Sequence, residues 1–303
     1  MYDIIVVGAG PAGLTAALYA RRADKSVLVI EKETFGGQIT YSPRVENYPG
    51  FNVMSGNEFA EKLIDQVSLQ GAEIELDTVT SIEGEGGNFT VHGKDADYNA
   101  KAVIIAAGSK HRQLGLLKEN ELIGEGVSYC AVCDGAFYRG KTVAVIGGGN
   151  TALQEAIALS EGCAKVFVVQ NLDFLTGEER LQRDIEQKDN ITIILGKVVK
   201  ELLGDKSMTG IVIEDNAGNT ETLDLDGIFV AIGQQPENEP FKDILELNEW
   251  GYIVSGEDCV PSGAAEGVFV AGDCRTKKIR QVTTATGDGA VAALAACRFI
   301  DNL

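Results

Sequence analysis

The chain has 303 residues, of which 45% are hydrophobic and only 7% aromatic, and it contains 36 glycines. This length suits two domains, and the composition is typical of an α/β protein with many tight strand–helix turns. The net charge of −19 argues against nucleic acid as a partner, because neutralising phosphates requires a basic face. No apolar run approaches the ~20 residues that span a bilayer, and no basic leader precedes the first predicted strand, so we expect a cytoplasmic protein.

The first predicted unit is a strand over residues 2–7, a glycine turn, a helix to about residue 22 and a strand over 26–31. The turn reads Gly8-Ala9-Gly10-Pro11-Ala12-Gly13, and its glycines allow a tight bend, close approach to a pyrophosphate and close helix–strand packing. Glu31 ends the second strand, where an acid can hold ribose hydroxyls. Because these features are in register, the segment predicts a dinucleotide site rather than a plain glycine turn.

Loops and a helix follow this unit. The loops over residues 35–40 and 45–50 are rich in glycine and polar amides, which suits backbone contacts to a flat ring system. We expect an amphipathic helix over about 55–70, short strands to about 100, and an apolar strand over 102–106 that ends near Gly108. Residues 110–117 are interpreted as a crossing into a second domain.

Cys130 and Cys133 form a CxxC pair with Asp134 immediately after it. Such a pair can close a disulfide ring, bind a metal or lie in a core. A zinc site would want a second pair, whereas the other cysteines are scattered singly (Cys163, Cys259, Cys274 and Cys297). A pair between two nucleotide-binding signatures, in a chain expected to be cytosolic, favours a redox disulfide. Asp134 is then a candidate proton donor or acceptor for a leaving thiolate.

A second strand–turn–helix–strand unit repeats the first. A strand over 142–146 leads into the turn at residues 147–152 (GGGNTA), a helix and a strand over 165–169. This duplication predicts an α/β fold of two Rossmann-like domains, each a three-layer ββα arrangement, with the second inserted in the first. The expected boundaries give a first domain over residues 1–113 and 240–303 and an inserted domain over 114–239. A strand over 268–271 and an alanine-rich helix from about residue 281 close the first domain.

Together these motifs resemble the low-molecular-weight thioredoxin reductases, flavoproteins whose FAD domain is interrupted by a smaller domain bearing CxxC. The resemblance covers essentially the whole chain and rests on GAGPAG (8–13), CAVCDG (130–135), GGGNTA (147–152) and AGDCRTKKIRQV (271–282). It implies an FAD enzyme that reduces thioredoxin or a thioredoxin-like protein. It also implies a homodimer and a smaller domain that rotates during the cycle.

The resemblance assigns roles residue by residue. Cys133 faces the flavin, Cys130 attacks the protein substrate, and Asp134 is the acid/base. The expected cofactor-binding residues are Gly8, Gly10, Pro11, Ala12, Gly13, Glu31, Lys32, Gly37, Gln38, Asn47, Gly108, Asp273, Arg280, Gln281 and Val282. No metal is expected.

One departure from the family pattern concerns the electron donor. NADPH-using members carry a basic HRRxxxR segment where this chain has Gln170-Asn171-Leu172-Asp173-Phe174-Leu175-Thr176. A 2′-phosphate without a cation loses charge-assisted hydrogen bonds of roughly 1.5–3 kcal/mol each. The pattern resembles the ferredoxin-dependent flavin thioredoxin reductases, so the sequence predicts ferredoxin as the donor. The intact glycine turn at 147–152 would then be inherited architecture.

The net charge of −19 disfavours an encounter with an acidic ferredoxin, so docking requires a local basic patch. The densest candidate comprises Arg275, Lys277, Lys278 and Arg280, and a second comprises Lys110, His111 and Arg112. Solvated surface charge is the alternative interpretation of both. Two other functions stay open: an NAD(P)H-dependent thioredoxin reductase with an atypical nucleotide site, and a flavin redox sensor that no longer turns over. His92 and His111 are interpreted as structural or surface residues.

Overall fold

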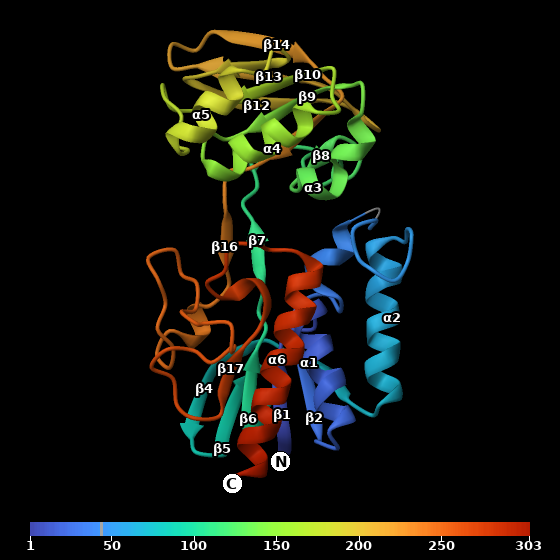
Figure 1. The fold of residues 1–303 in the computed structure, drawn as a ribbon, viewed down its shortest axis with the longest axis vertical. Coiled ribbons are helices and arrows are strands. Elements are labelled where there is room, and N and C mark those ends of the chain that lie inside the picture. The colour runs from blue at the N-terminus through green and yellow to red at the C-terminus, as the bar shows by residue number, and fades with distance from the viewer. Residues whose placement is uncertain (43–44) are drawn as a thin grey trace. The chain divides into compact units, whose positions relative to one another are not determined.

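The computed structural model describes residues 1–42 and 45–303 (Figure 1). The chain forms two compact units. The outer unit comprises residues 1–110 and 235–303, and the inserted unit comprises residues 111–234. The chain therefore divides a few residues before the expected boundaries at 113/114 and 239/240.

Parallel strands make up most of the outer unit's sheet, and an antiparallel hairpin extends it. The second half of β6 also pairs in parallel with β17. In spatial order the strands are β3 (Glu73–Leu76), β2 (Val27–Glu31), β1 (Tyr2–Val7), β6 (Asp97–Ile105), β5 (Asn88–Gly93) and β4 (Val79–Glu85), with β17 (Val268–Val270) beside β6. The central strands are buried on both faces, which explains their nearly continuous runs of Val and Ile.

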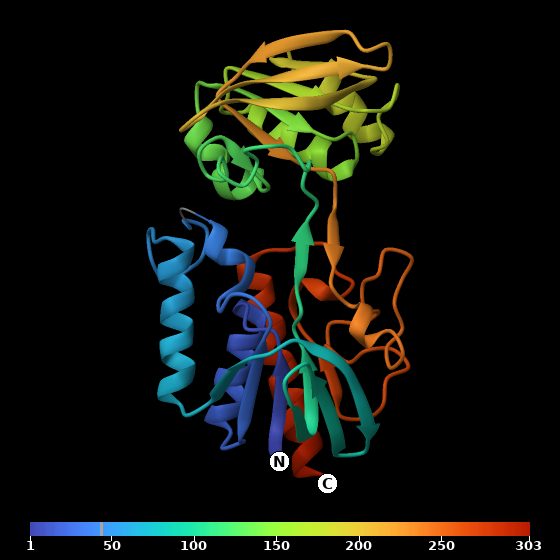
Figure 2. The ribbon, with the colours of Figure 1, turned by 180° about the vertical axis from the view of Figure 1, so that it is seen from behind.

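Each face of this sheet is covered by a different layer. Ile4 and Val6 of β1 pack with α1 (Pro11–Arg22) and α6 (Val282–Asp301), which lie side by side in Figure 1. Ile5 and Val7 point to the opposite face, because side chains alternate along a strand, and they share a cluster with residues of β4 and β5. Figure 2 shows those strands, in teal, from behind. Alternation along β1 thus produces the three-layer arrangement.

Local signals explain where the outer unit's helices begin. Pro11 is the first residue of α1, where its missing N–H costs nothing. The helix α2 (Gly56–Leu69) begins after Ser55, which forms a capping box with Glu58. Short 3₁₀ turns complete the unit: η1 (Gly37–Tyr41), η3 (Glu239–Phe241) and η4 (Gly272–Cys274).

The inserted unit repeats the layered plan. Its parallel sheet has the order β11 (Ile191–Ile194), β10 (Lys165–Val169), β9 (Thr142–Ile146), β15 (Gly227–Val230), β8 (Val127–Ser128). Ala144 and Ile146 of β9 pack towards the antiparallel strands β12 (Lys197–Gly204), β13 (Met208–Asp215) and β14 (Thr220–Asp224). Val143 and Val145 pack towards α4 (Asn150–Ser160) and α5 (Glu179–Glu186).

Two short elements carry the CxxC segment, and two strands mark the passage between the units. The helix α3 (Ala131–Asp134) continues into η2 (Gly135–Tyr138). The strands β7 (Ser109–His111) and β16 (Gln234–Pro236) pair with each other where the chain passes between the units.

The structure confirms the predicted α/β fold with one nucleotide-binding unit inserted in the other. The strands expected over 142–146 and 165–169 have those bounds, and the closing helix begins at Val282. Within residues 1–42 and 45–303, no helix is both long and apolar enough to cross a membrane.

Candidate functional site

The first glycine turn has the geometry that a dinucleotide site requires. Gly8 has a φ of +107°, and a Cβ on it would lie 2.4 Å from the carbonyl oxygen of Ala106. A Cβ on Gly13 would lie 1.9 Å from the Gly8 carbonyl oxygen. Both positions therefore demand glycine, one for the turn and one for packing of the helix against it.

Glu31 organises the strand end beside this turn. The residue is buried, and its Oε2 accepts a hydrogen bond from the Ala9 N–H at 2.8 Å. Its Oε1 accepts from the N–H groups of Lys32 and Glu33, each at 2.9 Å. The carboxylate is thus held at the end of β2, next to the glycine turn. The Lys32 side chain points into an ion pair with Glu237 (2.7 Å).

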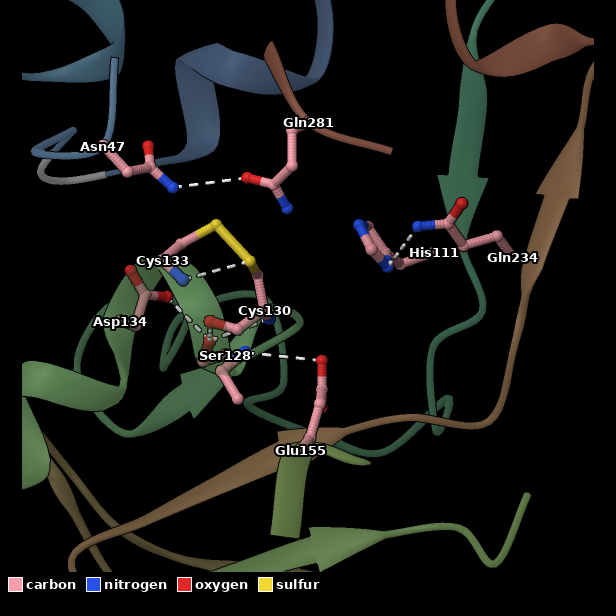
Figure 3. Close-up of a disulfide and its surroundings, with 10 residues drawn as sticks. Asn47, His111, Ser128, Cys130, Cys133, Asp134, Glu155, Gln234 and Gln281 are labelled. Carbon is pink, nitrogen blue, oxygen red and sulfur yellow. Dashed lines mark hydrogen bonds between the residues drawn. A yellow bond between two sulfur atoms is a disulfide. The ribbon is translucent and has the colours of Figure 1, made fainter. Parts of the chain in front are cut away.

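The loop after β2 approaches the turn through backbone alone. A Cβ on Gly37 would lie 3.1 Å from the Gly10 Cα, so these two glycines face each other without side chains. Gln38 lies in η1, beside Gly37. Asn47 donates from Nδ2 to Gln281 Oε1 (3.2 Å), just before α6 begins at Val282, which joins two predicted cofactor residues from distant parts of the sequence (Figure 3).

Asp273 and Arg280 each present a buried polar atom without a hydrogen-bond partner among the described residues. These atoms are Asp273 Oδ1 and Arg280 Nε. The Arg280 guanidinium lies 4.2 Å from the centroid of the Tyr252 ring, and burial raises the pKa of Asp273. Such orphaned polar atoms indicate a missing ligand. Together with the first glycine turn, these two atoms fit an FAD. Gly108, another predicted cofactor residue, bends the chain shortly after β6 with a φ of +70°.

The basic patch predicted at Arg275–Arg280 is wrong as a surface feature. The side chains of Arg275 and Lys277 are buried, and both pair with Asp288 of α6, at 3.0 Å and 2.9 Å respectively. Burial raises the pKa of Asp288, but hydrogen bonds from Arg275 and Lys277 outweigh it and lower the pKa overall. Only Lys278 of this patch is well exposed. The sequence could not show this, because Asp288 lies beyond the loop and nearly two turns into α6.

The second predicted patch is also largely neutralised. Lys110 pairs with Glu33 (2.7 Å) and Glu237 (3.5 Å). Burial lowers the pKa of His111, whose ring stacks on Tyr129 with centroids 5.3 Å apart. Arg112 is the exposed cation that remains. His92 contacts Asp97 (2.8 Å), so each of the two histidines lies against another side chain of the same unit.

Cys130 and Cys133 form a disulfide at the start of α3, with their Cα atoms 5.3 Å apart (Figure 3). Cys130 is the N-cap of α3, and its Sγ accepts a hydrogen bond from the Cys133 N–H at 3.2 Å. A donor aimed at Cys130 Sγ favours a thiolate on that sulfur once the disulfide is reduced. The remaining cysteines are buried and free (Cys163, Cys259, Cys274 and Cys297).

Asp134 lies beside the disulfide in a poorly hydrated place. Its Oδ2 accepts a 2.6 Å hydrogen bond from the Ser128 hydroxyl, and its Oδ1 is buried without a partner among the described residues. Burial raises the pKa of Asp134, and the Ser128 hydrogen bond opposes the rise only in part. A carboxyl tuned in this way can give and take protons closer to neutral pH than an ordinary aspartate. Ser128 also accepts from the Cys130 N–H (3.1 Å).

Sequence reasoning missed two acids near the CxxC segment. Glu119 accepts hydrogen bonds from three consecutive backbone N–H groups, those of residues 114–116, and from the Tyr129 hydroxyl (2.8 Å). Glu155 of α4 accepts from the Ala131 N–H (3.4 Å). Neither acid belongs to a recognisable motif. Their contacts with Tyr129 and Ala131 depend on tertiary packing that no local pattern reveals.

The second glycine turn is formed, but its neighbours are uncharged. Gly147 has a φ of +131°, and a Cβ on it would lie 2.5 Å from the Ala231 carbonyl oxygen, as at Gly8. The buried Gln170 side chain lies over Gly148, where a Cβ would come within 2.7 Å of its Cδ. Thr176 donates its N–H to the Gly148 carbonyl at 2.9 Å. This face thus offers an amide and a hydroxyl, with no cation between residues 170 and 176.

No group of three or more His, Cys, Asp or Glu side chains that could hold a metal ion occurs in the described part of the chain. The CxxC segment brings together two sulfurs and the carboxyl groups of Asp134 and Glu155. These groups suit thiol–disulfide exchange with linked proton transfer.

Comparison with known proteins gives a consistent result. Residues 2–289 match the family model described as "Pyridine nucleotide-disulphide oxidoreductase". The chain is 41% identical over 300 residues to a 34.2 kDa protein in the rubredoxin operon of Clostridium pasteurianum, covering 98% of this chain and 97% of that protein. It is 38% identical over 305 residues to thioredoxin reductase of Bacillus subtilis, covering 100% and 96%.

Solved structures point the same way. Thioredoxin reductase from Streptococcus pyogenes matches with a TM-score of 0.95 at 39% identity, over 100% of this chain and 99% of that one. A ferredoxin-flavin thioredoxin reductase from Clostridium acetobutylicum matches with a TM-score of 0.54 at 31% identity, over 100% and 99%. The similarity therefore does not single out the ferredoxin-dependent branch. The chain belongs to the pyridine nucleotide-disulphide oxidoreductase family and, within it, to the low-molecular-weight thioredoxin reductases.

Proposed function

We propose that this protein is an FAD-dependent thioredoxin-disulfide reductase that works through the Cys130–Cys133 disulfide. The observation that carries the proposal is that disulfide itself, beside the half-buried carboxyl group of Asp134, which is hydrogen-bonded to Ser128. Family membership supports FAD as the cofactor and thioredoxin as the substrate. The intact CxxC-Asp arrangement argues against a sensor that has lost turnover.

Reduction and exchange at the disulfide follow from the positions of these groups. The Cys130–Cys133 disulfide takes up two electrons and two protons and becomes two thiols; a bound FAD, once reduced by the electron donor, would supply the two electrons. Cys130 loses its proton and attacks one sulfur of the thioredoxin disulfide, forming a mixed disulfide and releasing a thioredoxin thiolate. Cys133 then loses its proton and attacks Cys130, which re-forms the bond and releases the second thiolate. The two protons end on thioredoxin, and Asp134 is placed to carry them.

The residues proposed to hold FAD all belong to the outer unit. The first glycine turn and the N-terminus of α1 would take the pyrophosphate, and Glu31 the ribose hydroxyls. The orphaned atoms of Asp273 and Arg280 would face other polar parts of the cofactor. Asn47 and Gln281, already hydrogen-bonded to each other, would complete the site from the opposite chain segments.

We propose a pyridine nucleotide as the electron donor, bound at an atypical site in the inserted unit. The family description and the formed turn at Gly147 support this choice. Gln170 can hydrogen-bond ribose hydroxyls through its amide, but nothing between residues 170 and 176 can neutralise a 2′-phosphate. NADH should therefore serve at least as well as NADPH.

Ferredoxin is the second candidate donor. It is favoured by the absence of Lys, Arg and His from residues 170–176 and by the similarity to the Clostridium acetobutylicum protein. Hydride transfer needs a nicotinamide held in near-attack geometry by its distant adenosine end, whereas electron transfer from an iron–sulfur protein needs only close approach. The neutralised basic patches weigh against this candidate, because they remove the docking surface that it requires.

Anaerobic stopped-flow mixing of the oxidised holoenzyme with NADH, NADPH or reduced ferredoxin distinguishes the donors. Rapid bleaching of the flavin by NADH, followed by thioredoxin reduction, is the expected result. Bleaching by ferredoxin alone would replace the pyridine nucleotide with the iron–sulfur donor. The proposed reductase function would be wrong if the enzyme failed to reduce thioredoxin with every donor and also after its own reduction by dithionite.

A further inference from the structure

Glu155 is a half-buried acid next to the redox disulfide, and the reaction described above does not use it. It lies on α4, and its Oε1 accepts a 3.4 Å hydrogen bond from the Ala131 N–H, the amide that directly follows Cys130 (Figure 3). Its Oε2 is buried and has no partner among residues 1–42 and 45–303. The side chain thus reaches from α4 to the first residue of α3.

The surroundings of Glu155 disfavour its charged form. Burial raises the pKa of Glu155 to about 7, and the Ala131 hydrogen bond opposes the rise only in part. No charged side chain contributes to this shift. An acid with such a pKa changes its protonation state near neutral pH.

Ionisable groups on the elements packed against α4 are occupied elsewhere. Asp134 of α3 is hydrogen-bonded to Ser128. On α5, Arg180 lies near Asp184, and Arg183 lies near Glu179. Lys165 of β10 lies over the Phe167 ring, and burial keeps the pKa of Tyr138 in η2 at about 12. The two cysteines of the disulfide lie next to the contact itself.

A carboxylate at Glu155 and a thiolate at Cys130 would place two negative charges near one backbone amide with little water. Like charges in such a place raise each other's pKa, so the two ionisations are coupled. A protonated Glu155 leaves the Cys130 thiolate free of this repulsion. The reduced disulfide should therefore sense whether Glu155 carries its proton.

We propose that Glu155 is a positioning residue of the redox disulfide, which supports the start of α3 and sets, through its protonation state, how readily Cys130 forms a thiolate. The proposal goes deeper into the proposed function and rests on the redox role of Cys130. Its test measures the thiolate directly, without thioredoxin or an electron donor, so that the two ideas can fail separately.

The test is the pH dependence of iodoacetamide alkylation of Cys130 in the holoenzyme, in a Cys133→Ser background. The other four cysteines are buried, so alkylation of the folded protein reports on Cys130. With Glu155 present, the rate should follow two ionisations. Glu155→Gln keeps an acceptor for the Ala131 N–H but cannot ionise, so the pH profile of its alkylation rate should follow a single ionisation, that of Cys130. At pH 8 it should react about threefold to tenfold faster, as expected for a coupling of roughly half to one pKa unit.

Two further variants complete the design. Glu161→Gln removes a carboxylate from the end of the same helix, where Glu161 is exposed and pairs with Lys188, and should leave the profile unchanged. Glu155→Asp keeps an ionisable group and should keep two ionisations. Retained flavin and an unchanged circular dichroism spectrum verify folding. The proposal is overturned if Glu155→Gln shows the parent profile or slower alkylation at pH 8, or if Glu161→Gln changes the profile equally.

Discussion

Ser128 is hydrogen-bonded to Asp134, the carboxyl group on which the proposed proton transfer depends. Its hydroxyl donates to Asp134 at 2.6 Å and so stabilises the ionised form against a burial that favours the neutral one. Removing this donor in Ser128→Ala should raise the pKa of Asp134 further. The Asp134 limb in the pH profile of thioredoxin turnover should therefore move to higher pH.

Steady-state turnover across pH, with saturating donor, measures this shift. Ser128→Thr retains the hydroxyl and is the matched control. Asp134→Asn should remove the limb and lower turnover by about 10²–10⁴, the usual loss for a positioned acid/base. A limb that stays in place in Ser128→Ala would show that Asp134 is not the group titrating.

The two cysteines should have distinguishable roles. Cys130→Ser and Cys133→Ser should each abolish thioredoxin reduction, because exchange needs both sulfurs, and both variants should keep FAD. If Cys133 is the sulfur that faces the flavin, Cys130→Ser should show a long-wavelength charge-transfer band from the Cys133 thiolate. Absorption spectra of the purified variants check this. Cys163→Ser, which alters a buried thiol of the same unit, should keep both turnover and the ordinary spectrum. A band in Cys133→Ser alone would reverse the roles.

At the scale of elements, Asp288 anchors the loop after η4 to α6. It receives bidentate hydrogen bonds from Arg275 and a third from Lys277, and it accepts from the Gly272 N–H at 3.0 Å. Asp288→Asn would leave two buried cations with a neutral partner. We expect a loss of about 3–5 kcal/mol in the free energy of unfolding, together with weaker FAD binding, because the neighbouring Asp273 and Arg280 lose their support.

Urea unfolding of the holoenzyme and FAD release during dialysis measure the two effects. Lys188→Ala breaks the exposed pair with Glu161 and should cost less than about 1 kcal/mol, which makes it a control for charge removal alone. Since the pKa of Asp288 is lowered on folding, its stabilisation is present above the unfolded-state pKa and is lost as the pH falls through the folded one. Equal losses of unfolding free energy in Asp288→Asn and Lys188→Ala would contradict a stabilising role of the Asp288 ion pairs.

Most elements could be predicted because their signals are local. The strand Thr142–Ile146 follows from an apolar run that ends at a glycine, and α2 follows from the amphipathic pattern over about residues 55–70. The basic patch failed for the opposite reason: Asp288 reaches Arg275 and Lys277 only after α6 packs on the loop. Glu155 gave no signal either, since a glutamate in a helix is ordinarily solvated. Contacts between side chains distant in sequence are what local patterns omit.

For the whole molecule, the net charge of −19 is not offset by a large exposed basic surface at either of the two predicted patches. An acidic ferredoxin would therefore meet repulsion on approach. If reduced ferredoxin bleaches the flavin, the second-order rate should rise as the ionic strength increases from about 0.01 M to about 0.15 M, because the Debye length falls from about 30 Å to about 8 Å.

Stopped-flow rates in a sodium chloride series check the direction of this change. The rate with NADH over the same series is the reference for salt effects on the enzyme itself. A rate with ferredoxin that falls with salt would reveal an attractive surface elsewhere on the molecule.

The four buried free thiols, those of Cys163, Cys259, Cys274 and Cys297, have a further consequence for an enzyme whose product carries reactive thiols. Burial raises the pKa of all four, to about 11 for Cys259 and Cys274, so hardly any thiolate is available on them at neutral pH. In the proposed mechanism, a mixed disulfide between Cys130 and thioredoxin is thus resolved by Cys133 without competition from another cysteine of the same chain. The fold protects the catalyst from trapping itself in dead-end disulfides during many cycles.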